Sequence, residues 1–268
     1  MTYIFGAQMD IAYTLIGFFV GFVVGVTGVG GGSLMTPILV LGFSIPPAIA
    51  VGTDLLYASI TKSTGIFIHH ARKTIDWDIV KLLSIGSIPS ACLSIFILKN
   101  MLVSGIDYER VITNTLSFAL ILTSLVLLFK GQIQKLSQNE RLSGIKTLHR
   151  QLRKPLTIFS GALIGFLVTL SSVGAGALGA AILFFLYPRM RAISIVGTDL
   201  AHAVPITAIA GLGHAHLGTV DYMLLVSLLI GSIPGIYIGS NLGSYLPEKI
   251  MRPVLASMLL MIGIRFAI

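Results

Sequence analysis

Residues 25–37 read GVTGVGGGSLMTP, with five glycines in eight positions, in the middle of one of the most apolar stretches of the chain. Glycine destabilises a helix, and a backbone inside a membrane cannot leave its N–H and C=O groups unpaired. The chain is 55% hydrophobic and only 10% charged, whereas soluble domains are about a quarter charged. Uncharged segments such as the 19 residues Val111–Phe129 recur along it. The sequence therefore predicts an all-α polytopic membrane protein with a helix interrupted at these glycines.

The chain is a duplication of one unit. VGTD occurs at 51–54 and 196–199, and GSIP occurs at 86–89 and 231–234, both at a spacing of 145 residues. With a one-residue gap, the glycine run itself has a counterpart, VGAG, at 173–176. Apolar composition does not produce several four-residue words in one register by chance. We therefore predict two homologous halves, at 1–130 and 155–268.

The apolar stretch that begins each half is too long for one membrane crossing and too short for two. Ile11–Leu41 would extend for about 46 Å as one helix, which exceeds the ~30 Å hydrocarbon core but is short for two crossings. We expect two half-length helices that form a re-entrant hairpin, followed by three spans. In the first half the hairpin is at 11–41 and the spans are near 47–70, 79–98 and 110–129. In the second half the hairpin is at 156–187 and the spans are near 192–214, 222–240 and 250–267.

Charge in the loops predicts the orientation of the halves. Seven of the 18 Lys and Arg residues lie between Lys130 and Lys154, so the linker 131–154 is expected in the cytoplasm. Equivalent loops then carry positive charge on opposite sides: Arg72 and Lys73 have no basic counterpart in 215–221. This swap favours an inverted repeat. A parallel repeat with four full crossings in each half is the alternative.

A helix that breaks inside the membrane presents free backbone N–H groups and a positive dipole end. Glycines allow close approach to that backbone, and hydroxyl groups add donors. Two corresponding breaks predict one mid-membrane site for a small anion. Its predicted substrate-binding residues are Thr27, Gly28, Gly30, Gly31, Gly32 and Ser33 in the first half, and Ser171, Ser172, Gly174 and Gly176 in the second. Alternatively, the glycines only allow close helix packing.

Ionisable residues inside spans indicate function by default. Lys62, near the centre of its span, is predicted to attract the anion. Asp54 and Asp199 occupy the same place in the two VGTD words, and His202 shares a helix face with Asp199. These three are predicted to serve proton coupling or structural charge pairing. The single cysteine, Cys92, excludes an internal disulfide and a cysteine-based zinc site.

The residues GVTGVGGGSLMTPIL (25–39), AVGTDLLYASITKSTG (50–65) and an Asp-Trp followed by GSIP, with their counterparts in the second half, resemble the TauE/SafE family of sulfite exporters, also called the toluene sulfonate uptake permease family. The resemblance covers nearly the whole chain. It implies secondary transport of sulfite, thiosulfate, sulfoacetate or another organosulfonate across the cytoplasmic membrane of a prokaryote. It also carries Thr53 and Thr198, in the two VGTD words, into the predicted substrate site. Thr207 stands opposite Lys62, which suggests that the halves contribute unequally.

The predicted function is a multi-pass secondary transporter that alternates access around this site. An anion channel is the first alternative. An intramembrane enzyme is the second, but the chain has no HExxH and no GxSG within a span. The expected partners are the anion, the bilayer and protons. No nucleic acid is expected, because the basic linker explains the net charge of +8. No cofactor or metal is expected either.

Overall fold

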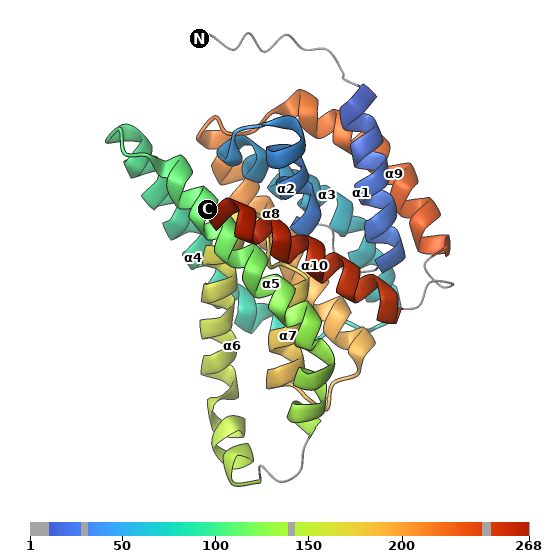
Figure 1. Cartoon of the computed structure of the whole chain (residues 1–268). Coiled ribbons are helices and arrows are strands. Elements are labelled where there is room, and N and C mark those ends of the chain that lie inside the picture. Colours follow the sequence, from blue (N-terminus) through green and yellow to red (C-terminus); the bar gives the residue numbers. More distant parts are fainter. Residues whose placement is uncertain (1–10, 28–31, 139–142, 243–247, 268) are drawn as a thin grey trace.

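The computed structural model describes residues 11–27, 32–138, 143–242 and 248–267, and within these ranges the chain is helical, without strands. The helices of the first half are α1 (Ile11–Thr27), α2 (Gly32–Phe43), α3 (Pro47–Ala71), α4 (Trp77–Val103) and α5 (Tyr108–Gln138). Those of the second half are α6 (Ser143–Ser171), α7 (Ala177–Leu186), α8 (Ala192–His216), α9 (Tyr222–Leu242) and α10 (Glu248–Ala267). Figure 1 shows them as one bundle.

The expected membrane protein is confirmed by the length and composition of these helices. Five helices of the described residues, in α4, α5, α6, α8 and α9, are long and apolar enough to cross a membrane. The helix α3 has 25 residues, or about 37 Å, so it is also long enough to cross. Each of the six predicted spans corresponds to one helix whose ends lie within a few residues of the expected ones, except that α5 continues to Gln138.

Each of the two segments predicted as hairpins consists of two helices of unequal length. In the first half α1 has 17 residues and α2 has 12. In the second half α6 has 29 residues, of which Leu152–Ser171 is long enough to cross a membrane, and α7 has only 10. The helix α6 is longer than the expected first arm of the second hairpin because it begins at Ser143, inside the linker 131–154.

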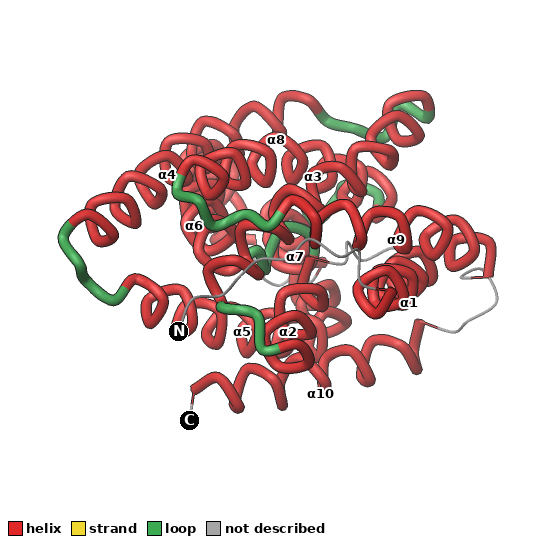
Figure 2. The backbone as a smooth tube through the Cα atoms, turned by 90° about the horizontal axis from the view of Figure 1, so that it is seen from above, coloured by secondary structure: helices red, strands yellow, loops and turns green. Residues whose placement is uncertain are grey.

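The first helix of each half packs against the fourth helix of the other half. In Figures 1 and 2, α1 lies along α9 and α4 lies along α6. At the first contact the backbone of Leu228 lies so close to Gly17 that a Cβ there would overlap it, and Gly231 lies equally close to Thr14. Between α4 and α6, a Cβ on Gly86 would overlap the backbone of Ile158, and a Cβ on Gly161 would overlap the backbone of Leu83. These glycines therefore serve close packing, as small residues do in membranes.

Two pairs of equivalent helices run antiparallel to each other. The start of α3 lies against the segment that follows α8, because Thr53 Oγ1 accepts a hydrogen bond of 3.0 Å from the Asp221 backbone N–H. The start of α8 lies against the segment that follows α3 in the same way, because Thr198 Oγ1 accepts one of 2.9 Å from Asp76 N–H. We call these the two cross-half contacts. The helices α5 and α10 are also antiparallel, as their bonds Ser117–Gly263 and Ser124–Ala256 show.

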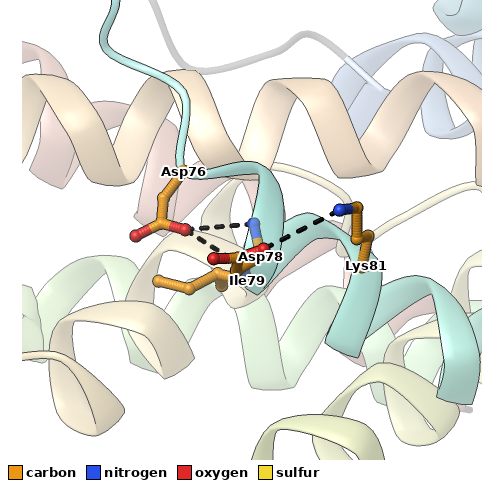
Figure 3. A network of polar contacts seen from close by, with 4 residues as sticks. All are labelled: Asp76, Asp78, Ile79 and Lys81. Carbon is orange, nitrogen blue, oxygen red and sulfur yellow. Dashed lines mark hydrogen bonds and ion pairs between the residues drawn. The ribbon is translucent and has the colours of Figure 1, made fainter.

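Each cross-half contact is built on a fixed turn. Asp76 caps α4, since its Oδ1 accepts hydrogen bonds of 3.1 and 3.2 Å from the N–H groups of Asp78 and Ile79 (Figure 3). Asp221 caps α9 through Met223 and Leu224 with the same pattern. The cap holds each aspartate N–H in place for the threonine of the other half.

Candidate functional site

The second-half glycines form a real interruption of the helix. α6 ends at Ser171 and α7 begins at Ala177. Between them Gly174 and Gly176 have φ angles of 114° and 136°, and Ser172 has a φ of 56°. These positive values suit glycine, and a serine there is uncommon. The predicted break is therefore present in this half, and we call residues 172–176 the second-half break.

At the first-half glycines the structure describes the helices on either side. α1 ends at Thr27 and α2 begins at Gly32, so the helices stop on both sides of the predicted break. Gly28, Gly30 and Gly31 lie outside the described residues, and the side chains of Thr27 and Ser33 are likewise not described.

Lys62 reaches across the repeat to the second-half break. Its side chain comes from the middle of α3 and is only 6% exposed. Its Nζ donates a hydrogen bond of 2.8 Å to the backbone carbonyl of Ala175. The first half therefore supplies the buried cation, while the second half supplies the broken helix against which it lies. A buried ammonium group is costly unless it is paired, so this position is a candidate binding site.

Two buried carboxylates accompany Lys62. The charges of Asp199 and Asp54 both act on its ammonium group. Asp54 is fully buried, and its Oδ2 accepts a hydrogen bond of 2.6 Å from Thr36 Oγ1 of α2. Asp199 is 4% exposed and lies against Gly179 of α7, where a Cβ would overlap its Oδ1. Each aspartate thus contacts the short second arm of its own hairpin.

His202 has a hydroxyl partner instead of a carboxylate. Its Nε2 lies 2.8 Å from Ser87 Oγ of α4, and both side chains are buried. The equivalent residues at the spacing of 145 are Tyr57 and Ser232. The Tyr57 hydroxyl lies beside Ser232 but makes no hydrogen bond among the described residues. Sequence reasoning missed Tyr57 and Ser87, although Ser87 stands in the repeated word GSIP.

The predicted hydroxyl ligands divide into two groups. Thr53 and Thr198 make the cross-half contacts near the starts of α3 and α8. Ser171 Oγ donates to the Leu167 carbonyl at 2.6 Å and accepts from Val173 N–H at 3.2 Å, so it terminates α6. Ser172 differs, because its buried Oγ has no hydrogen-bond partner among the described residues and lies beside the Asp54 carboxyl group. Of the predicted hydroxyl ligands whose side chains are described, Ser172 is therefore the one that lies beside Asp54.

In the part of the chain that the structure describes, the site thus combines the Lys62 cation, two carboxylates, hydroxyl groups without a hydrogen-bond partner and a helix break, all inside the bundle. Within the described ranges no group of three or more His, Cys, Asp or Glu side chains could hold a metal ion. The helix α7 starts at the break with Gly176 as its N-cap residue and no side-chain cap. Its N-terminal dipole and the Lys62 ammonium both favour a negatively charged ligand.

Comparison with known proteins places the chain among membrane transporters. A model of the family described as "Sulfite exporter TauE/SafE" matches residues 13–266. The chain is 40% identical over 257 residues to "Probable membrane transporter protein YjnA" of Bacillus subtilis, covering 96% of this chain and 99% of that protein. It is 30% identical to "Probable membrane transporter protein MJ0441" of Methanocaldococcus jannaschii, covering 93% and 92% respectively. No solved structure matches the chain.

Proposed function

Because the chain belongs to the TauE/SafE family of sulfite exporters, we propose that it is a secondary transporter of a small sulfur-containing anion. The substrate class comprises sulfite, thiosulfate, sulfoacetate and other organosulfonates, and the site of action is the cytoplasmic membrane. One observation carries the proposal: Lys62, buried in the middle of α3, bonds the backbone of the second-half break at Ala175. A buried cation held at an open helix start is suited to an oxyanion.

In this proposal the substrate displaces the Ala175 carbonyl from the Lys62 ammonium. An oxyanion offers several acceptor oxygens, so it can take the Lys62 hydrogen bond and a backbone N–H of α7 together. Ser172 adds a hydroxyl that has no other partner among the described residues. In the first half, Thr27, Gly28, Gly30, Gly31, Gly32 and Ser33 are proposed to complete the site from the opposite hairpin.

Alternating access is proposed to arise from an inverted repeat of two re-entrant hairpins. The antiparallel course of α3 and α8, and of α5 and α10, supports this arrangement. In Figure 1, α1 runs downward and its equivalent α6 runs upward, which supports it as well. The two cross-half contacts lie at opposite ends of α3. We propose that one opens while the other stays closed, so that the site faces one side at a time.

A channel is the second candidate for the same site. A buried ammonium bonded to a backbone carbonyl favours a carrier, because this contact has to be broken for each anion that passes. An enzyme is disfavoured by the transporter names of the relatives.

The proposal is tested by flux into vesicles that contain the purified full-length chain. We expect uptake of at least one labelled anion among sulfite, thiosulfate and sulfoacetate, and competition by the unlabelled anion. Vesicles prepared without protein provide the control for leakage. Uptake equal to that of this control for all three anions would count against the proposed substrate class.

Topology gives a separate prediction. In a Cys92→Ser background, a cysteine at Lys73 should react with a membrane-impermeant reagent only from the cytoplasmic side, and a cysteine at Gly218 only from the outside. The reason is the charge of Arg72 and Lys73 at the end of α3, which equivalent residues after α8 lack. Labelling of whole cells and inverted vesicles measures this. Reaction of both positions from one side would leave only the parallel arrangement.

A further inference from the structure

The Asp54 carboxyl group has one oxygen that the fold does not satisfy. Its Oδ2 accepts the Thr36 hydrogen bond, whereas Oδ1 is buried and has no hydrogen-bond partner among the described residues. The residue is fully buried in α3. An ionised carboxylate with a bare oxygen in such a place is strongly disfavoured, because burial removes the water that would solvate it. A protonated carboxyl group is disfavoured far less.

The neighbours of Asp54 suit a proton on this oxygen. The Ser172 hydroxyl of the second-half break lies beside the carboxyl group and has no hydrogen-bond partner among the described residues. The Tyr57 hydroxyl, also from α3, is near enough for the Asp54 charge to act on it, and it too has no hydrogen-bond partner in the described part of the chain. A proton on Oδ1 makes that oxygen a donor, for which Ser172 Oγ is the acceptor in reach. In this contact the protonated group, unlike an ionised carboxylate, carries no charge that burial would leave unsolvated.

The charges around Asp54 also favour protonation of its carboxyl group when an anion binds. α3 contributes Lys62 and Tyr57, α2 contributes the neutral Thr36, and the second-half break contributes Ser172, while Asp199 of α8 acts on the same Lys62. One ammonium group against two ionised carboxylates gives the site a negative sum, which repels an anion. Protonation of Asp54 removes that excess.

We infer that Asp54 is the proton-binding site of this chain, and that its proton travels with the anion. The step forms an O–H bond at Oδ1 with a proton from the water on the side to which the site is open. The same bond breaks when the site opens to the other side and the proton returns to water, so nothing is oxidised or reduced. This inference rests on the proposed anion transport.

The second-half break contacts both the proposed proton site and the proposed anion site. Ser172 lies beside Asp54, and Ala175, three residues on, accepts the Lys62 hydrogen bond. A proton at Asp54 and an anion at Lys62 therefore act on the same short segment between α6 and α7. Loading of both sites changes the contacts of this segment together, which is what coupled movement requires.

The test compares two kinds of flux in vesicles with labelled thiosulfate, whose charge does not change near neutral pH. A pH gradient with the acidic side outside drives accumulation of the anion in the vesicles, the reversed gradient drives its release, and equal pH on both sides allows exchange of labelled for unlabelled anion. Asp54→Asn should lower gradient-driven accumulation by about tenfold more than it lowers exchange, which lies in the usual range of coupling between sites. Asp78→Asn changes an exposed carboxylate at the start of α4 (Figure 3) and should accumulate like the wild type.

A second readout does not depend on transport. Infrared difference spectra of the purified protein between acid and alkaline solution should contain a carboxylic-acid C=O band that Asp54→Asn removes and Asp78→Asn keeps. A band unchanged by Asp54→Asn, or accumulation that falls no more than exchange, would overturn the inference. If no sulfur anion is transported by the wild type, the proposed function fails, and the infrared band alone then decides whether Asp54 binds a proton.

Discussion

Lys62→Met is expected to lower transport of the sulfur anion by about a hundredfold, because removing one partner of a buried hydrogen-bonded charge costs several kcal/mol. The substitution keeps the length of the side chain and removes the only described cation at the second-half break. Initial rates of flux into vesicles, at matched amounts of protein, measure the loss. Uptake at the wild-type rate would show that Lys62 does not touch the anion.

Stability separates binding from charge pairing in the same variant. Lys62→Met leaves Asp54 and Asp199 buried without their cation, and breaking a buried pair in this way typically costs about 3–5 kcal/mol. We therefore expect a lower temperature of thermal unfolding in detergent. Asp199→Asn added to Lys62→Met should restore the unfolding temperature but not the transport. If the double variant also recovered transport, Lys62 would be a structural partner only.

Gly176→Leu is expected to abolish transport. Gly176 has a φ of 136° and is the N-cap residue of α7, so any side chain there is strained by about 1–3 kcal/mol. It would also stand between the anion and the start of α7. The vesicle flux assay measures the loss, and the amount of membrane-inserted protein is measured in parallel. Normal flux through a folded Gly176→Leu protein would mean that the break serves packing alone.

Gly105→Leu provides the matched control. Gly105 also has a positive φ, of 67°, but it lies in the connection between α4 and α5, where an added Cβ would meet nothing within 4 Å. Its strain should lower stability to a similar degree while transport per folded protein stays unchanged. From the sequence we expect Gly31→Leu to act like Gly176→Leu, and Gly31 lies outside the described residues.

The sequence could predict the helices because apolar length and repeated words are local signals. The spacing of 145 residues aligned Asp54 with Asp199, and both are buried in equivalent places beside the second arm of a hairpin. It also placed Lys62 near the middle of its span, which is where the structure has it. These predictions depend only on counting residues along the chain.

The partners of the polar groups could not be predicted, because they come from the other half. Lys62 bonds Ala175, which is 113 residues away, and Thr53 bonds Asp221, 168 residues away. From the sequence we expect Lys62→Met to keep or gain stability if the lysine serves the anion, and to lose stability only if it pairs with Asp54 or Asp199, because the sequence does not show which carboxylates face this lysine. Hydroxyl groups are equally ambiguous: Ser171 bonds the carbonyl four residues earlier, whereas its neighbour Ser172 does not.

The most direct test of the proposed carrier is counterflow. Vesicles containing the full-length chain are loaded with unlabelled sulfite, diluted into a trace of labelled sulfite, and sampled over time, with thiosulfate and sulfoacetate tested in the same way. A carrier with one site that alternates between the two sides predicts a transient accumulation of label above its outside concentration, lost in Lys62→Met and Gly176→Leu. Label that only rises to the outside concentration, at a rate independent of the anion inside, would contradict the carrier and favour a channel.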